Sequence, residues 1–120
     1  MAKTLAIVFG AVFVLVGILG FFPNPLVGPD ALFVTDTMHN IVHLLFGAIL
    51  LVVAFAAAAM SGLWLMILGV VYLVLAVLGF FLIPEGGQLL GIVAMNHADH
   101  WLHVALGVAL IGSSFLAKRA

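Results

Sequence analysis

Four long runs of apolar residues decide what this chain can fold into. They cover about residues 4–22, 37–60, 63–83 and 97–117, and none has a Lys, Arg or Glu in its middle. A helix needs roughly 20 apolar residues to cross the hydrocarbon core of a bilayer. Because backbone groups in lipid must be satisfied within their own segment, such runs form helices rather than strands. The sequence therefore predicts an all-α membrane protein of four transmembrane helices.

The composition is that of a protein with lipid as its solvent. Apolar residues make up 68% of the 120 residues and charged residues 6%, whereas a soluble domain is about 45–50% apolar and about 25% charged. The length suits one membrane domain over residues 1–120. A net charge of −1 leaves no basic surface for nucleic acid. Cysteine is absent, which excludes iron–sulfur clusters, thiolate metal sites and covalent haem attachment.

The few basic and acidic residues are expected at opposite ends of the predicted helix bundle. The basic residues Lys3, Lys118 and Arg119 lie outside the first and last runs, on one side of the predicted bundle. The acidic residues lie on the other side, at Asp30, Asp36, Glu85 and Asp99. By the positive-inside rule, the sequence predicts a multi-pass membrane protein with both termini in the cytoplasm. The first run is longer than a usual signal core, so we expect it to be retained as a helix.

An internal repeat divides the chain into two similar halves. Residues 10–22 resemble residues 69–81, and the segment from His43 to Gly47 resembles that from His103 to Gly107. The predicted repeats are residues 4–60 and 63–117, two tandem helical hairpins. Units of two helices keep the same orientation, so the halves should be related by an axis along the membrane normal.

Helix breakers and caps fall between the runs. We expect breaks at the Pro23–Pro29 segment, at Ser61-Gly62 and at the Pro84–Gly87 segment. Asp36 and Asn96 precede the second and fourth helices at equivalent places and suit helix N-caps. Asp99 lies in the first turn of the fourth helix, where a carboxylate stabilises the helix dipole and can also orient a histidine.

The five histidines are the residues most able to carry chemistry. They lie at His39, His43, His97, His100 and His103, all in the first two turns of the second and fourth helices. Residues three and four apart share a helix face. His43 and His103 are equivalent in the two halves, and both should lie inside the edge of the hydrocarbon.

Several uses of these side chains remain open. Two imidazoles, from His43 and His103, can hold haem iron axially. Three or four can hold zinc or copper, with a carboxylate behind them; this candidate set is His39, His43, Asp99, His100 and His103. Gly47 and Gly107, one turn from the deep histidines, would leave room for a flat ring, including a chlorophyll-type pigment. The plainer interpretation is that the histidines hydrogen-bond between helices and the glycines let helices pack closely.

Other classes of function have no support in the sequence. No Lys, Arg, Asp or Glu falls at the bilayer centre, where a proton or ion pump normally needs one. There is no phosphate loop, serine nucleophile motif or H-E-x-x-H motif. We therefore do not expect an enzyme or a conventional transporter.

One known family shares these motifs. The segment from Asn96 to Gly107 carries the pattern Asn-x-Ala-Asp-x-Trp-Leu-His, and residues 40–47 repeat part of it. In this the chain resembles domain of unknown function 4383, a family of small bacterial four-span membrane proteins. His97 and His100 stand where relatives are expected to have Thr and Asn, which shifts the weight of a shared site toward Asp99, His103 and His43. The resemblance implies the topology and no activity.

The function expected from the sequence is a non-enzymatic structural or accessory subunit of a membrane complex. Its partners would be the lipid bilayer and either other membrane subunits or further copies of the chain. The alternative is a haem-, metal- or pigment-binding membrane protein that uses the histidine pair on the second and fourth helices. A third is a sensor protonated through the outer histidines, since histidine titrates near neutral pH.

Overall fold

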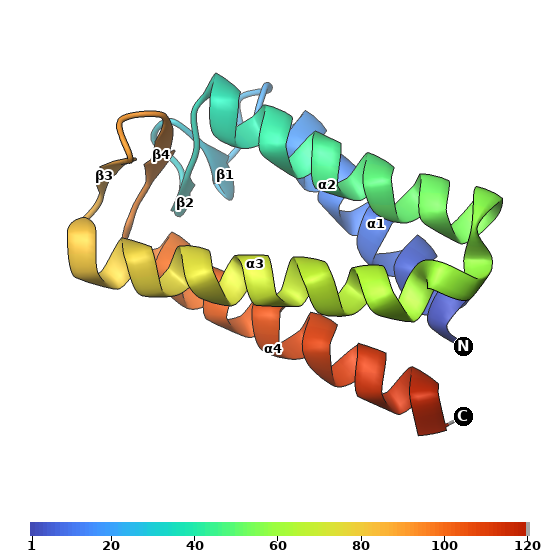
Figure 1. Cartoon of the computed structure of the whole chain (residues 1–120). Coiled ribbons are helices and arrows are strands. Elements are labelled where there is room, and N and C mark those ends of the chain that lie inside the picture. Colours follow the sequence, from blue (N-terminus) through green and yellow to red (C-terminus); the bar gives the residue numbers. More distant parts are fainter. Residues whose placement is uncertain (120) are drawn as a thin grey trace.

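The protein is a bundle of four long helices. The computed structural model describes residues 1–119, with side chains over residues 1–117. The helices are α1 (Ala2–Leu19), α2 (Thr37–Ala56), α3 (Ser61–Leu82) and α4 (His97–Arg119), and the short 3₁₀ helix η1 (Ala58–Met60) lies between α2 and α3 (Figure 1). All four are long and apolar enough to cross a membrane. The predicted class, an all-α membrane protein with four transmembrane helices, is confirmed.

The turn between α2 and α3 differs from the sequence prediction. The expected break at Ser61-Gly62 was wrong, because α2 already ends at Ala56 and the chain turns at Ala57, whose φ is −146°. Ser61 is instead the first residue of α3, with its side chain fully buried. Alanine favours a helix over most alternatives, so tertiary packing, and not a breaker residue, sets this turn.

The helices pack closely in two pairs, α1 with α2 and α3 with α4, and glycines lie at both contacts. A Cβ at Gly47 of α2 would lie 2.7 Å from the carbonyl oxygen of Gly10 in α1. A Cβ at Gly107 of α4 would lie 3.0 Å from the carbonyl oxygen of Gly69 in α3. Small residues at helix crossings let two backbones come together in lipid, where packing replaces the hydrophobic effect as the driving force. The fold therefore consists of two tight helical hairpins.

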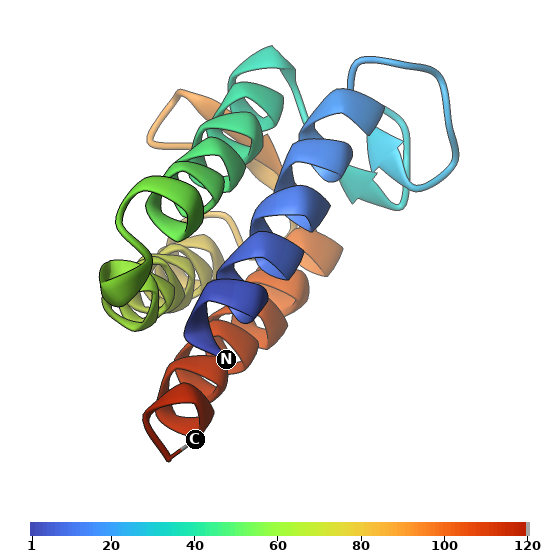
Figure 2. The ribbon, with the colours of Figure 1, turned by 90° about the vertical axis from the view of Figure 1, so that its right-hand side faces the viewer.

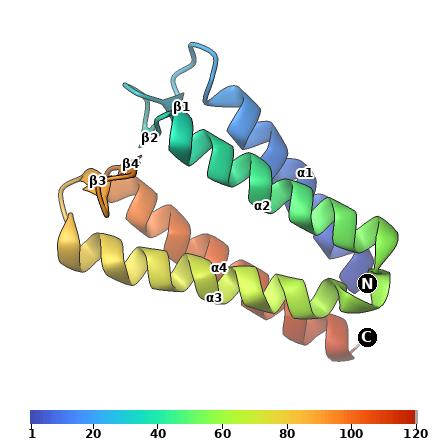
Figure 3. The ribbon, with the colours of Figure 1, turned by 45° about the horizontal axis from the view of Figure 1, so that its top comes forward.

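The two hairpins meet at one end of the molecule and diverge toward the other. Both chain termini lie at the end where the hairpins meet, which also holds η1 (Figures 1 and 2). From there the α1–α2 and α3–α4 pairs splay apart toward the loops (Figure 3). The acidic residues of the loops thus lie at the end opposite Lys3. The side chains of Lys118 and Arg119, part of the predicted charge asymmetry, lie outside the described residues.

Small β structures close the diverging end. In the first loop β1 (Val27–Gly28) pairs in parallel with β2 (Phe33–Val34), and in the second β3 (Gly87–Leu89) pairs antiparallel with β4 (Val93–Met95). The loops also contact each other, since the Asn96 side-chain amide donates to the Leu32 carbonyl at 2.8 Å. These apolar loops fold over the bundle instead of extending away from it.

The buried faces of α2 and α4 follow the same spacing. The buried residues of α2 are His39, Asn40, His43, Gly47, Leu50 and Ala54. Those of α4 are Asp99, His100, His103, Gly107, Leu110 and Ser114. Each member of the second set stands at the position equivalent to a member of the first. The internal repeat stays a prediction, since the paired strands of the two loops run in different directions.

Apolar side chains cover the outside as well as the core. Phe13, Leu50, Leu65, Tyr72 and Leu110 are almost fully buried at the centre. Large apolar side chains are nevertheless exposed along every helix; they include Leu15, Val52, Phe55, Val74, Phe81 and Val108. Extensive exposed apolar surface is a feature that a soluble monomer avoids. This outer surface is suited to contact with lipid.

Candidate functional site

Three histidines from two helices converge inside the bundle, near its loop end. His39 and His43 come from successive turns of α2, and His103 comes from α4. All three are buried, with 2%, 4% and 1% of their surface exposed. One ring nitrogen from each can be chosen so that the three lie within 4.8 Å of one another. We call this set the histidine cluster.

The rings of the cluster form a compact triangle. The His39 and His43 rings stack, with their centroids 5.0 Å apart and an angle of 13° between planes. The His103 ring lies 5.7 Å from His39 and 6.5 Å from His43. The pair predicted to be equivalent, His43 and His103, thus faces the interior from both halves, and His39 joins it.

The hydrogen bonds of these histidines leave ring nitrogens that could bind a metal ion. His39 Nδ1 donates to the Ala94 carbonyl at 2.6 Å, because a carbonyl oxygen only accepts, and so its Nε2 carries a lone pair. His43 Nδ1 lies 3.4 Å from the Tyr72 hydroxyl. His103 Nδ1 is buried and has no hydrogen-bond partner among the described residues. A histidine that binds a metal usually donates its other ring N–H in the way that His39 does.

Tyr72 belongs to this site, and the sequence analysis missed it. It lies on α3 with 1% of its surface exposed, and its ring is 5.3 Å from that of His103 and 5.4 Å from that of Phe13. The signal was present: Tyr72 is the single tyrosine of the chain, and the repeat aligns it with Phe13. Tyr72 differs from Phe13 by a hydroxyl group, and a hydroxyl in the middle of an apolar span needs a polar neighbour.

His100 and Asp99 do not join the cluster, which corrects the predicted metal set. His100 turns to α3, where Nε2 donates to the Ile83 carbonyl at 2.7 Å. Asp99 accepts from the Asn96 backbone N–H at 2.9 Å and from the backbone of Val34 in β2. Both residues share the helix face of His103, but their hydrogen bonds direct the side chains to α3 and to the loops. Asp99 is therefore part of the helix cap, as also expected, and binds the first loop to the second hairpin.

The predicted caps are confirmed, and His97 stays at the surface. Asp36 accepts from the His39 backbone N–H at 2.9 Å, and Asn96 accepts from that of Asp99 at 3.0 Å. His97 Nδ1 donates to the Pro84 carbonyl at 3.0 Å, while its Nε2 accepts from Trp101. These bonds link His97 to the second loop and to its own helix, away from the cluster.

The glycines beside the deep histidines do not make room for a flat ring. A Cβ at Gly47 would meet Val14 of α1 at 2.7 Å, and one at Gly107 would meet Leu73 of α3 at 2.6 Å. Neighbouring helices thus already fill the space that the absent side chains leave. The predicted clearance for a macrocycle was wrong, and the plainer interpretation, close helix packing, accounts for both residues.

An apolar pocket adjoins the histidine cluster. It has a volume of about 200 Å³ and lies between α2 and α3, with β3 and β4 at its outer side. His39, His43, His103 and Tyr72 provide its polar groups. The remaining lining residues are Val42, Phe46, Val71, Leu75, Leu89, Leu90, Ile92, Val93 and Met95. The cluster therefore opens onto a small, almost wholly apolar space.

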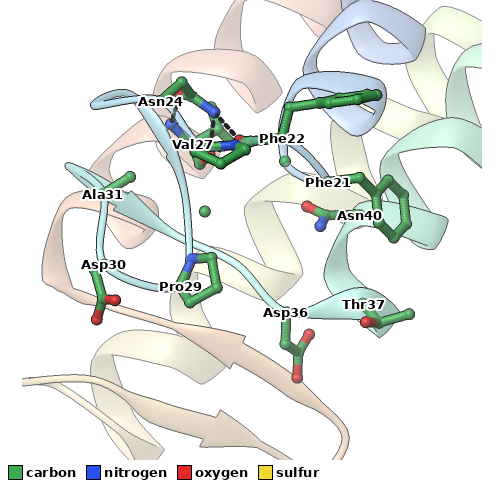
Figure 4. Close-up of a pocket in the computed structure, with 13 residues that line it drawn as sticks. Phe21, Phe22, Asn24, Val27, Pro29, Asp30, Ala31, Asp36, Thr37 and Asn40 are labelled. Carbon is green, nitrogen blue, oxygen red and sulfur yellow. Dashed lines mark hydrogen bonds between the residues drawn. The ribbon is translucent and has the colours of Figure 1, made fainter.

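A larger hollow of about 510 Å³ lies in the first loop, away from the cluster. Figure 4 shows its wall, in which the Asn24 amide turns back to the backbone and the carboxylates of Asp30 and Asp36 lie well apart. One Asp36 oxygen already caps α2. These carboxylates do not converge, and among the described residues the groups that come close enough to bind an ion together are those of the histidine cluster.

Three imidazoles so close together are a ligand set that could hold a transition-metal ion. Nitrogens bound to one zinc ion at about 2.0–2.1 Å lie roughly 3.4 Å apart in tetrahedral geometry. The present spacing is at most 4.8 Å, so the rings would have to move closer together to bind one ion. Imidazole suits zinc, copper, iron and nickel. Three such ligands leave one position open for a further ligand.

Comparison with known proteins gives one match. The sequence model of the family described as "Domain of unknown function (DUF4383)" matches residues 3–116. No curated protein and no solved structure matches the chain. The matched range covers nearly the whole length of all four helices and every residue of the histidine cluster.

Proposed function

Because the chain belongs to the DUF4383 family, whose description names no activity, we propose its function from its own geometry: it binds one transition-metal ion in the membrane through His39, His43 and His103. A single observation carries this proposal. Three imidazole nitrogens from two helices come within 4.8 Å of one another in an apolar span.

The burial of these rings supports a bound ion. Burying a polar group without a hydrogen bond costs roughly 2–7 kcal/mol, depending on the reference, and lipid offers no water to compensate. His103 Nδ1 is such a group among the described residues. Coordination would satisfy ring nitrogens that the protein leaves without partners.

Zinc or copper fits this site better than haem or chlorophyll. A pocket of about 200 Å³ lies below the range of about 300–1,000 Å³ typical of sites for drug-sized ligands. A tetrapyrrole also needs free space on several sides of its axial ligands, and Val14 and Leu73 occupy two of them. A single ion needs none of this space.

We further propose that the protein acts as a non-enzymatic accessory subunit in the bacterial inner membrane. The short loops form no separate catalytic domain, so an ion held here would act within a complex of membrane subunits or of further copies of this chain. The exposed apolar faces of the helices offer the surface for such partners. Co-purification from mild detergent identifies them.

The termini of this protein are expected to lie in the cytoplasm. Lys3, Lys118 and Arg119 lie near the two termini, and basic residues are retained on the cytoplasmic side. We expect a reporter active only outside the cytoplasm to be inactive when fused to either terminus, and active when inserted between Gln88 and Ile92. Activity at a terminal fusion would contradict the proposed orientation.

Metal content tests the proposed function. The protein is purified in mild detergent without a polyhistidine tag, dialysed against zinc, and freed of excess ion. We expect about one zinc per chain by elemental analysis. A chain that retains less than about a tenth of an equivalent, and shows no cobalt spectrum after dialysis against Co²⁺, would refute the proposal.

A further inference from the structure

We infer that the apolar pocket holds the single aromatic ring of a lipid-soluble molecule, and that a nitrogen or oxygen donor group attached to this ring occupies the open position on the metal ion. This inference rests on the proposed function, because the ion supplies the polar anchor. The ligand class follows from the position, the size and the lining of the pocket.

The position of the pocket places a ligand against the open side of the ion. His39, His43 and His103 all line it. On another side, Phe13 packs against His43 with ring centroids 6.1 Å apart, and the Ala94 carbonyl holds His39. Three protein ligands leave a fourth position to water or an exogenous donor. A donor that approaches from the pocket meets no other polar group except the Tyr72 hydroxyl.

The size of the pocket matches one aromatic ring. An engineered cavity of about 150 Å³ in another protein binds benzene, and this pocket has about 200 Å³. One aromatic ring, attached to a donor group that reaches the ion, matches that space, whereas a tetrapyrrole is too large for it.

The lining selects a neutral apolar body. The lining contains no Asp, Glu, Lys or Arg. A charged ligand would lose its hydration there and find no oppositely charged side chain to replace it. Val71 and Leu75 of α3 and Val42 and Phe46 of α2 line the pocket. These two helices diverge toward the loops (Figure 3). A ligand of this kind partitions into lipid and can enter between these helices.

The test compares two azoles that share a donor and differ only in the ring body. Co²⁺-loaded protein is titrated with imidazole and with 4-phenylimidazole, and the cobalt absorption bands report coordination. We expect 4-phenylimidazole to bind on the order of tenfold to a hundredfold more tightly, since its phenyl ring would be buried. Equal affinities of the two azoles would overturn the inference.

Paired variants locate the binding. Val71→Trp fills the pocket and should remove the advantage of 4-phenylimidazole, whereas Val70→Trp, on the neighbouring lipid-facing position, should preserve it. If Val71→Trp loses helical structure by circular dichroism, Leu75→Ala serves instead. The enlarged pocket should then bind 4-(1-naphthyl)imidazole more tightly than the wild-type pocket does, and an unchanged affinity would overturn the inference.

The two proposals fail in different ways. Cobalt stoichiometry is measured before any azole is added. A protein that takes up no cobalt refutes the metal site and, with it, the ligand. A protein that binds one cobalt but does not distinguish the azoles keeps the metal site and loses only the ligand.

Discussion

Replacing His43 or His103 by alanine should lower the affinity for zinc by more than about a hundredfold. Loss of a group that only supports a ligand already costs about 10–100-fold, and these variants remove a ligand itself. His39→Ala should behave in the same way, because its Nε2 is oriented by the bond from Nδ1 to the Ala94 carbonyl. The affinity is measured by competition with a chromogenic chelator.

Two other histidines provide matched controls on the same helix as His103. His97→Ala removes an imidazole that contacts Pro84 and Trp101, and His100→Ala removes one that contacts Ile83. Both should keep zinc affinity within a few-fold of the wild type. If they weaken binding as much as His103→Ala does, the ion is held at the helix start and not in the histidine cluster.

Gly107→Ala should destabilise the protein by roughly 1–3 kcal/mol, the usual cost of forcing an extra group into a packed interface. The new Cβ would lie 2.6 Å from Leu73 and 3.0 Å from the Gly69 carbonyl oxygen. The Leu73 side chain can move away from the new Cβ. The Gly69 carbonyl oxygen belongs to the backbone, which cannot move away without opening the α3–α4 pair. Thermal unfolding in detergent, followed by circular dichroism, measures the change.

Gly112→Ala, on the same helix, is the matched control and should have the opposite sign. A Cβ at Gly112 meets no atom within 4 Å. Alanine in a helix interior is favoured over glycine by about 0.5–1 kcal/mol. Similar midpoints for Gly107→Ala and Gly112→Ala would mean that the glycines do not set the distance between the helices.

The sequence was sufficient for the parts of the fold that depend on local physics. Span length in lipid predicted four helices, and the side chains of Asp36 and Asn96 predicted where α2 and α4 begin. The equivalence of His43 and His103 predicted that two deep imidazoles face the interior. Each of these features follows from residues within one or two helical turns of one another, where spacing alone determines geometry.

Features that depend on packing between helices could not be predicted in the same way. The turn at Ala57 lies in a run of good helix formers, so no residue of that run signals the end of α2. His100 and His39 both lie one turn from a deep histidine, yet His39 joins the cluster and His100 faces Gly79 of α3. Which histidine joins the cluster depends on how neighbouring helices are rotated relative to each other. The spacing of residues along the sequence does not determine that rotation.

Zinc K-edge X-ray absorption of protein loaded with one zinc per chain tests the metal site most directly. Three imidazole nitrogens at about 2.0–2.1 Å, with one further light donor, are expected, and two imidazoles should remain in His43→Ala. An absorption spectrum that shows fewer than three imidazole ligands in the wild type, or that does not change in His43→Ala, would contradict a zinc ion held by His39, His43 and His103.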